Sequence, residues 1–184
     1  MRTFAAIDLD PEIKRSLQDL ILKLKRTGAD VRWVGSQGMH LTLKFLGEVG
    51  EDRVPAIEGV LRGAAGASSS FPLVLQGTGT FPEGKSPRII WAGFKEEPAL
   101  IALQMAVEDG LEREGFPREE RAFHPHLTFG RVKSPSGIRE ALLELEKYRG
   151  ALFGEMTARR LTLFESVLKP QGAEYRAISG FEFT

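Results

Sequence analysis

The stretch HLTLKFLGEV, residues 40–49, returns in shortened form as HLTFGRV at residues 126–132. Two of the three histidines in this 184-residue chain therefore open the same tripeptide, His-Leu-Thr. Both copies alternate polar and apolar residues, which is the pattern of a strand with one buried face. The copies lie about half a chain length apart, and this spacing indicates two related lobes that contribute one motif each.

Successive side chains of a strand point to opposite faces, so each motif is predicted to hold its histidine and threonine side by side. The apolar face of the first copy, with Leu41, Leu43 and Phe45, is expected to anchor the strand in a core. The polar faces are expected to hold His40, Thr42 and Lys44 in the first copy, and His124, His126 and Thr128 in the second.

Strand and helix patterns alternate irregularly along the rest of the chain. Helices are predicted after Pro11, Val54, Pro98 and Ile138, because apolar residues recur there at helical spacing. Several predicted strands follow one another directly, which favours antiparallel sheets in an α+β fold over a doubly wound parallel sheet. Residues 63–70 (GAAGASSS) are the best candidate for a linker, and residues 78–86 (TGTFPEGKS) for an exposed loop. The predicted strands cover residues 3–8, 31–34, 40–46, 71–77, 87–94, 126–132, 158–168 and 174–183.

Composition excludes several kinds of site. The 25 basic and 25 acidic side chains cancel, so any contact with nucleic acid must be local. The chain has no cysteine and therefore no disulfide, thiolate nucleophile or thiolate metal site. Asp8 and Asp10 interrupt the N-terminal apolar run, and no segment approaches the roughly 18 apolar residues of a membrane span. We therefore expect a cytoplasmic protein without membrane contact.

Two imidazoles facing each other suit a reaction that needs a base on one side and an acid on the other. Both protonation states of histidine exist near neutral pH, because its unperturbed pKa is about 6.5. In-line displacement at phosphorus has this requirement, since the attacking water loses a proton while the leaving oxygen gains one. The neighbouring threonine hydroxyls can donate hydrogen bonds to the phosphoryl oxygens. The sequence therefore predicts an enzyme acting on a phosphate ester.

The two motifs, with VRWVGSQGMHLTLKFLGEV and FHPHLTFGRVK around them, resemble those of the two-histidine (2H) phosphoesterases. The resemblance is to the bacterial RNA 2′,3′-cyclic phosphodiesterases, also called 2′-5′ RNA ligases, and runs through most of the chain. It implies one domain over residues 1–184, made of two pseudo-symmetric lobes whose motifs face each other across a central cleft. The implied activity is metal-independent hydrolysis of a 2′,3′-cyclic phosphate to a 2′-phosphate, with ATP-independent 2′-5′ joining of RNA ends as a side activity. The implied substrates are RNA ends, tRNA fragments among them, and a monomer without cofactor is expected.

The resemblance also assigns roles to the motif residues. It implies that His40 donates a proton to the leaving 3′ oxygen and that His126 accepts one from water. Thr42 and Thr128 match the hydroxyls that hold the phosphate.

Further substrate contacts are expected from Arg131, Lys44, Phe81 and His124. Arg131 matches a basic residue of the family, but strict alternation turns it away from His126 unless a bulge at Gly130 brings it back. Phe81 is the favoured platform for a base to stack on, and Trp33, Trp91 and Tyr175 are alternatives that more often pack in a core.

Two other readings stay open. His124 and His126 could hold a zinc ion if a third ligand existed, which would make the protein a metallohydrolase. The chain could also be a non-catalytic module that binds nucleotides or RNA ends, although binding alone needs no paired acid and base.

Overall fold

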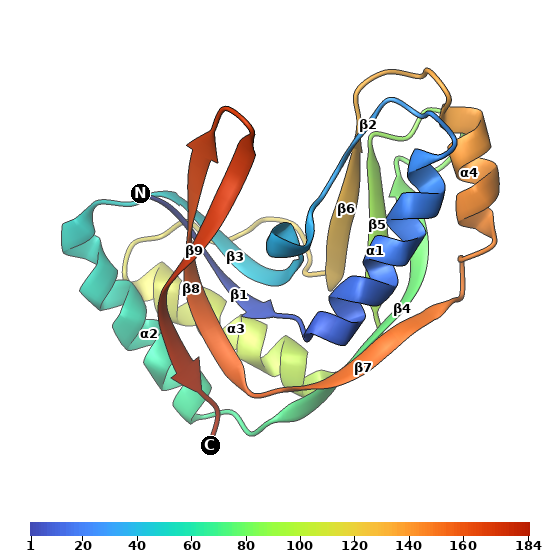
Figure 1. The fold of residues 1–184 in the computed structure, drawn as a ribbon. Helices are drawn as coiled ribbons and strands as arrows, with labels where there is room; N and C mark the ends of the chain where they lie inside the picture. Colours follow the sequence, from blue (N-terminus) through green and yellow to red (C-terminus); the bar gives the residue numbers. More distant parts are fainter.

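The chain folds into two antiparallel sheets, and each sheet contains one of the His-Leu-Thr strands (Figure 1). The computed structural model describes all 184 residues and confirms the predicted α+β class. The four-stranded sheet has the order β3-β1-β8-β9, and the five-stranded sheet has the order β2-β6-β5-β4-β7. The strands are β1 (Arg2–Asp8), β2 (Val31–Trp33), β3 (His40–Glu48), β4 (Phe71–Phe81), β5 (Ile89–Phe94), β6 (His126–Val132), β7 (Leu152–Ala158), β8 (Arg160–Lys169) and β9 (Gly172–Glu182).

Four α-helices pack against the two sheets. They are α1 (Pro11–Lys25), α2 (Val54–Gly66), α3 (Pro98–Arg113) and α4 (Ile138–Glu146). Helix α2 contacts β8 and β9, and α3 contacts β3, while α1 contacts β7 and α4 contacts β4. Each sheet is therefore covered by a different pair of helices, as Figure 1 shows. None of the helices has the length and apolar character needed to cross a membrane.

Helix α1 begins where the sequence predicts. Asp10 is its N-cap residue and Pro11 takes the first helical position, where the missing N–H of proline costs nothing. Its buried residues recur at a spacing of three to four, so one face enters the core and the charged residues stay outside. These buried residues are Ile13, Leu17, Leu20, Ile21 and Leu24.

Two predicted boundaries are wrong, and one strand was missed. Half of the expected linker is the end of α2, because Ala64 and Ala65 are buried against the core. Strand β4 runs on to Phe81, into the expected loop, because Gly77 adopts a positive φ of 83° and the pairing with β5 resumes after a register shift. Strand β7 was not predicted at all.

The link between β7 and β8 carries the chain from one sheet to the other. Strand β7 pairs with β4 in the five-stranded sheet, and β8 pairs with β1 in the four-stranded sheet. Only Arg159 separates the two strands. This crossing lies beside the end of β1 and the start of α1 (Figure 1).

Candidate active site

Strand β3 keeps Thr42 on the expected face but turns Lys44 to the opposite one. Directly paired residues on neighbouring strands point to the same side of a sheet. Thr42 pairs with Ala6 and Lys44 pairs with Ala5, so two steps along β3 match one step along β1. Leu43 is the extra residue of a β-bulge, which reverses the alternation beyond it. The expectation that Lys44 extends the polar face of the motif is therefore wrong.

On that opposite face Lys44 forms a buried ion pair with α3. Its Nζ lies 2.6 Å from Oε1 of Glu108 and 2.8 Å from the carbonyl oxygen of Pro117. The same carboxylate oxygen accepts the backbone N–H of Glu119 at 2.8 Å. Both charged side chains are about 95% buried. Lys44 thus connects β3 to the segment that leads into β6 and is not free to contact a substrate.

The imidazole of His40 lies in a cluster of aromatic rings on the other face of the sheet. Its ring centroid is 4.5 Å from that of Phe164, 5.3 Å from that of Tyr175 and 5.7 Å from that of Phe4. Phe45, which the bulge brings to this side, packs on Phe4 and is 71% exposed. His40 itself is only 8% exposed, so it is less accessible than the sequence suggested.

Burial lowers the pKa of His40 from 6.5 to about 4, because the charged imidazolium loses its hydration. Asp8 opposes this effect, since its Oδ1 lies 3.9 Å from the Nε2 of His40. Lys14 forms an ion pair with the same carboxylate oxygen at 2.8 Å and lowers the pKa of His40 slightly. Asp8 also pairs with His40 across β1 and β3, so these two side chains share a face.

His126 differs from His40 in exposure and in hydrogen bonding. It is exposed, and its Nδ1 lies 2.7 Å from the carbonyl oxygen of His124. A carbonyl can only accept, so Nδ1 carries the hydrogen of the neutral ring and Nε2 keeps the lone pair. The His124 side chain is exposed, and the residue acts on His126 through its backbone.

Strand β6 contains the bulge that the sequence allowed near Gly130. Thr128 pairs with Trp91 and Gly130 pairs with Ile90, so Phe129 is the extra residue. Beyond the bulge, Arg131 pairs with Ile89, which lies on the same face as Trp91. Arg131 therefore shares the face of Thr128 and His126, and its guanidinium is exposed.

The aromatic candidates are divided between this face and the core. Phe81 pairs with Ile89 across β4 and β5, so it lies in the same row as Arg131, and it is 62% exposed. Trp91 lies one row away over Gly79, where any Cβ would overlap its indole ring. Trp33 instead stacks on Phe129 at 6.3 Å and packs against the core.

The fold brings the two motif strands together, because β3 and β6 contact each other although they come from different sheets. The residues beside His40 that sequence reasoning missed are Phe4, Asp8 and Phe164. The signal for Phe4 and Asp8 was a position on the face of β1 that pairs with the first motif, and Phe164 is the partner of Phe4 on β8. No group of three or more His, Asp or Glu side chains in the chain is placed to hold a metal ion.

Two sheets that each present a His-x-Thr pair define the class of two-histidine phosphoesterases. Comparison with known proteins agrees, since the model of the 2′-5′ RNA ligase superfamily matches residues 10–169. The chain belongs to this superfamily.

Individual relatives resemble the chain over its whole length. The RNA 2′,3′-cyclic phosphodiesterase of Archaeoglobus fulgidus is 37% identical over 182 residues, which cover 99% of this chain and 100% of the relative. The protein of the same name from Thermotoga maritima is 35% identical and covers 100% and 96%. Among solved structures, TT0787 of Thermus thermophilus superposes with a TM-score of 0.84 at 28% identity, covering 100% of this chain and 98% of that one. E. coli LigT complexed with 3′-AMP gives 0.78 at 26% identity, with the same coverage.

Proposed function

We propose that this protein is an RNA 2′,3′-cyclic phosphodiesterase that forms 2′-phosphate ends, with His126 as the base and His40 as the acid. The observation that carries the proposal is the state of His126, whose Nδ1–H is bonded to a carbonyl and whose exposed Nε2 can accept a proton. The names of the relatives support the substrate, and the paired motifs support the reaction.

The reaction requires one proton transfer on each side of phosphorus. Nε2 of His126 takes a proton from a water molecule while the oxygen of that water forms the new bond to phosphorus. The bond from phosphorus to the 3′ oxygen breaks, and His40 gives its proton to that oxygen. The product keeps the phosphate on the 2′ oxygen. Acid and base catalysis each contribute about 10²- to 10⁴-fold, and positioning supplies further acceleration.

His40 must be charged to act as the acid, although burial keeps it neutral at pH 7 in the free protein. A phosphodiester anion about 4 Å away would stabilise the imidazolium by about 4 kcal/mol at an effective dielectric constant of 20. This interaction is large enough to return the pKa of His40 to the neutral range. The bound substrate anion therefore favours the protonated form of His40, which can then act as the acid. The Asp8 carboxylate also raises the pKa of His40.

Thr42, Thr128 and Arg131 would bind the non-bridging oxygens. Each threonine shares the face of its motif histidine by strand pairing, and the bulge in β6 adds the guanidinium of Arg131 to the second set. Charge-assisted hydrogen bonds from arginine favour the added negative charge of the transition state. Phe81 and His124 are proposed as peripheral contacts to the nucleotide.

Ligation follows from the same chemistry. When the 5′ hydroxyl of a second RNA replaces water, the same displacement yields a 2′-5′ linkage and needs no ATP. The proposal places the reaction in the cytoplasm, in a monomer of one domain with two pseudo-symmetric lobes. Its substrates are RNA fragments, including pieces of tRNA.

Hydrolysis of adenosine 2′,3′-cyclic phosphate tests the proposal. With chelator present, we expect adenosine 2′-phosphate as the product, separated from the 3′ isomer by chromatography. His40→Ala and His126→Ala should each lower turnover by about 10²- to 10⁴-fold while circular dichroism shows an intact fold. Binding without turnover would instead make the chain a nucleotide-binding module. Loss of activity to chelator with recovery in zinc would make it a metallohydrolase.

A further inference from the structure

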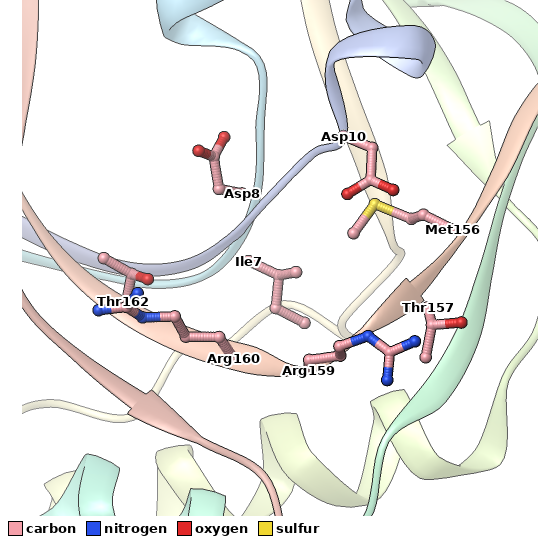
Figure 2. A pocket seen from close by; sticks show the side chains of 8 residues that line it. All are labelled: Ile7, Asp8, Asp10, Met156, Thr157, Arg159, Arg160 and Thr162. Carbon is pink, nitrogen blue, oxygen red and sulfur yellow. The ribbon is translucent and has the colours of Figure 1, made fainter.

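A polar cavity borders the residues around His40. It has a volume of about 310 Å³ and lies where β7 passes into β8, beside the end of β1 and the start of α1 (Figure 2). Figure 2 shows carboxylates on one wall, basic and hydroxyl groups on the other, and Ile7 between them. Its polar lining residues are Asp8, Asp10, Thr157, Arg159, Arg160 and Thr162.

Charged groups on both walls remain available to a ligand. Asp10 is the N-cap residue of α1, yet its carboxylate makes no capping hydrogen bond. Neither Asp10 nor Arg159 forms an ion pair, whereas Asp8 is bonded to Lys14. Arg160 lies 3.5 Å from the carboxylate of Glu182, and its side chain is 58% exposed.

This cavity lies on the same face of the sheet as the first motif. Thr42, Ala6, Thr162 and Gly180 are successive partners across β3, β1, β8 and β9, so they form one row. Thr162 is thus two strand spacings, or about 10 Å, from Thr42. The guanidinium of Arg160 lies over Gly180, where a Cβ would overlap it. The row therefore continues from the proposed phosphate-binding threonine to an arginine.

The mixed charge of the cavity limits what it can hold. A free anion bound by the two arginines would meet the Asp8 and Asp10 carboxylates on the opposite wall. A ligand with hydroxyl groups beside one negative charge satisfies both walls, because carboxylates accept hydrogen bonds from hydroxyls and guanidinium groups donate to phosphate. A ribose joined to a phosphodiester has this composition, and the volume suits one nucleotide unit.

We infer that this cavity binds the nucleotide preceding the cyclic-phosphate end, with Arg159 and Arg160 on its phosphodiester and Asp10 on its ribose 2′ hydroxyl. The inference rests on the proposed function and specifies its substrate as an oligonucleotide. Arg159 and Arg160 lie where β7 passes into β8 and belong to neither His-Leu-Thr motif. The cavity gives both arginines a common ligand.

The test compares kcat/KM for a 2′,3′-cyclic mononucleotide with that for the dinucleotide ending in the same cyclic phosphate. The wild type should prefer the dinucleotide by about tenfold, the factor that 1.4 kcal/mol of interaction produces. Arg159→Gln should remove most of this preference and keep the mononucleotide rate within about twofold. Arg149→Gln is the matched control, because Arg149 is 77% exposed and pairs only with Glu146 on the surface. It should keep the full preference.

A third substrate tests the acidic wall. A dinucleotide whose first ribose is 2′-deoxy should lose several-fold in kcat/KM with the wild type, and this loss should vanish in Asp10→Ala, which has no side-chain acceptor. Equal rates for mononucleotide and dinucleotide would overturn the inference and leave the proposed function standing. No hydrolysis of either substrate would instead overturn the proposed function, and the inference with it.

Discussion

Replacing His40 by glutamine should flatten the dependence of stability on pH. The His40 side chain is 6% exposed, and burial lowers its pKa from 6.5 in the unfolded chain to about 4 in the folded protein. Between these two pH values the unfolded chain binds more protons than the folded protein, so the free energy of unfolding rises with pH. The loss of unfolding free energy that the buried imidazole causes is absent above pH 6.5, grows as the pH falls, and is complete below pH 4.

The size of the effect follows from the two pKa values. One pKa unit corresponds to about 1.36 kcal/mol, so a difference of about 2.5 units destabilises the folded protein by roughly 3 kcal/mol at pH 4. This is a large share of the 5–15 kcal/mol that usually stabilises a domain. Glutamine keeps a polar side chain at this position but does not titrate.

Urea unfolding followed by circular dichroism at pH 7, 5.5 and 4 measures the effect. Contributions of the titrating groups that do not interact with His40 cancel in the difference between wild type and His40→Gln. We expect this difference to change by about 3 kcal/mol between pH 7 and pH 4, with the wild type losing more stability. A difference that stays constant over this range would show that the imidazole is hydrated, and the account of its pKa would be refuted.

Three further substitutions test other parts of the site. His126→Ala should lower kcat for the cyclic nucleotide by about 10²- to 10⁴-fold. His124→Ala should lower kcat much less, because His124 acts through its backbone carbonyl, which the substitution keeps. Equal losses of kcat in the two variants would reassign the base. Lys44→Met should cost about 3–5 kcal/mol in urea unfolding, since it leaves the Glu108 carboxylate buried without a charged partner, and adding Glu108→Leu should recover most of this. A neutral single variant would contradict the ion pair. Arg131→Gln should lower kcat/KM about tenfold in steady-state assays, and an unchanged kcat/KM would remove Arg131 from the phosphate site.

The two motif strands could be predicted because each has a strong local pattern. The bulge that returns Arg131 to the face of His126 was also foreseeable, since Gly130 is the kind of residue that marks a bulge. The matching bulge in β3 carries no such mark. Its extra residue is Leu43, which stands between Thr42 and Lys44 in a regularly alternating run, and strict alternation therefore placed Lys44 on the wrong face.

The surroundings of His40 could not be predicted from the motif. The rings that cover it come from Phe4 in β1, Phe164 in β8 and Tyr175 in β9, which only the completed sheet brings together. The low exposure and lowered pKa of His40 are thus tertiary effects.

Strand β7 was missed for a different reason. It lies at the edge of its sheet and Gly154 interrupts it, so its apolar residues do not alternate regularly with polar ones. Without β7, the crossing at Arg159 and the cavity beside it could not be placed.

The assignment of His40 as the acid and His126 as the base is tested most directly with a 2′,3′-cyclic phosphate whose 3′ bridging oxygen is replaced by sulfur. A thiolate leaves without protonation, so an enzyme lacking its acid should still cleave this substrate. We expect His40→Ala to hydrolyse it at close to the wild-type rate, while His126→Ala stays inactive. Rescue of His126→Ala instead, or of neither variant, would contradict the assignment of His40 as the proton donor.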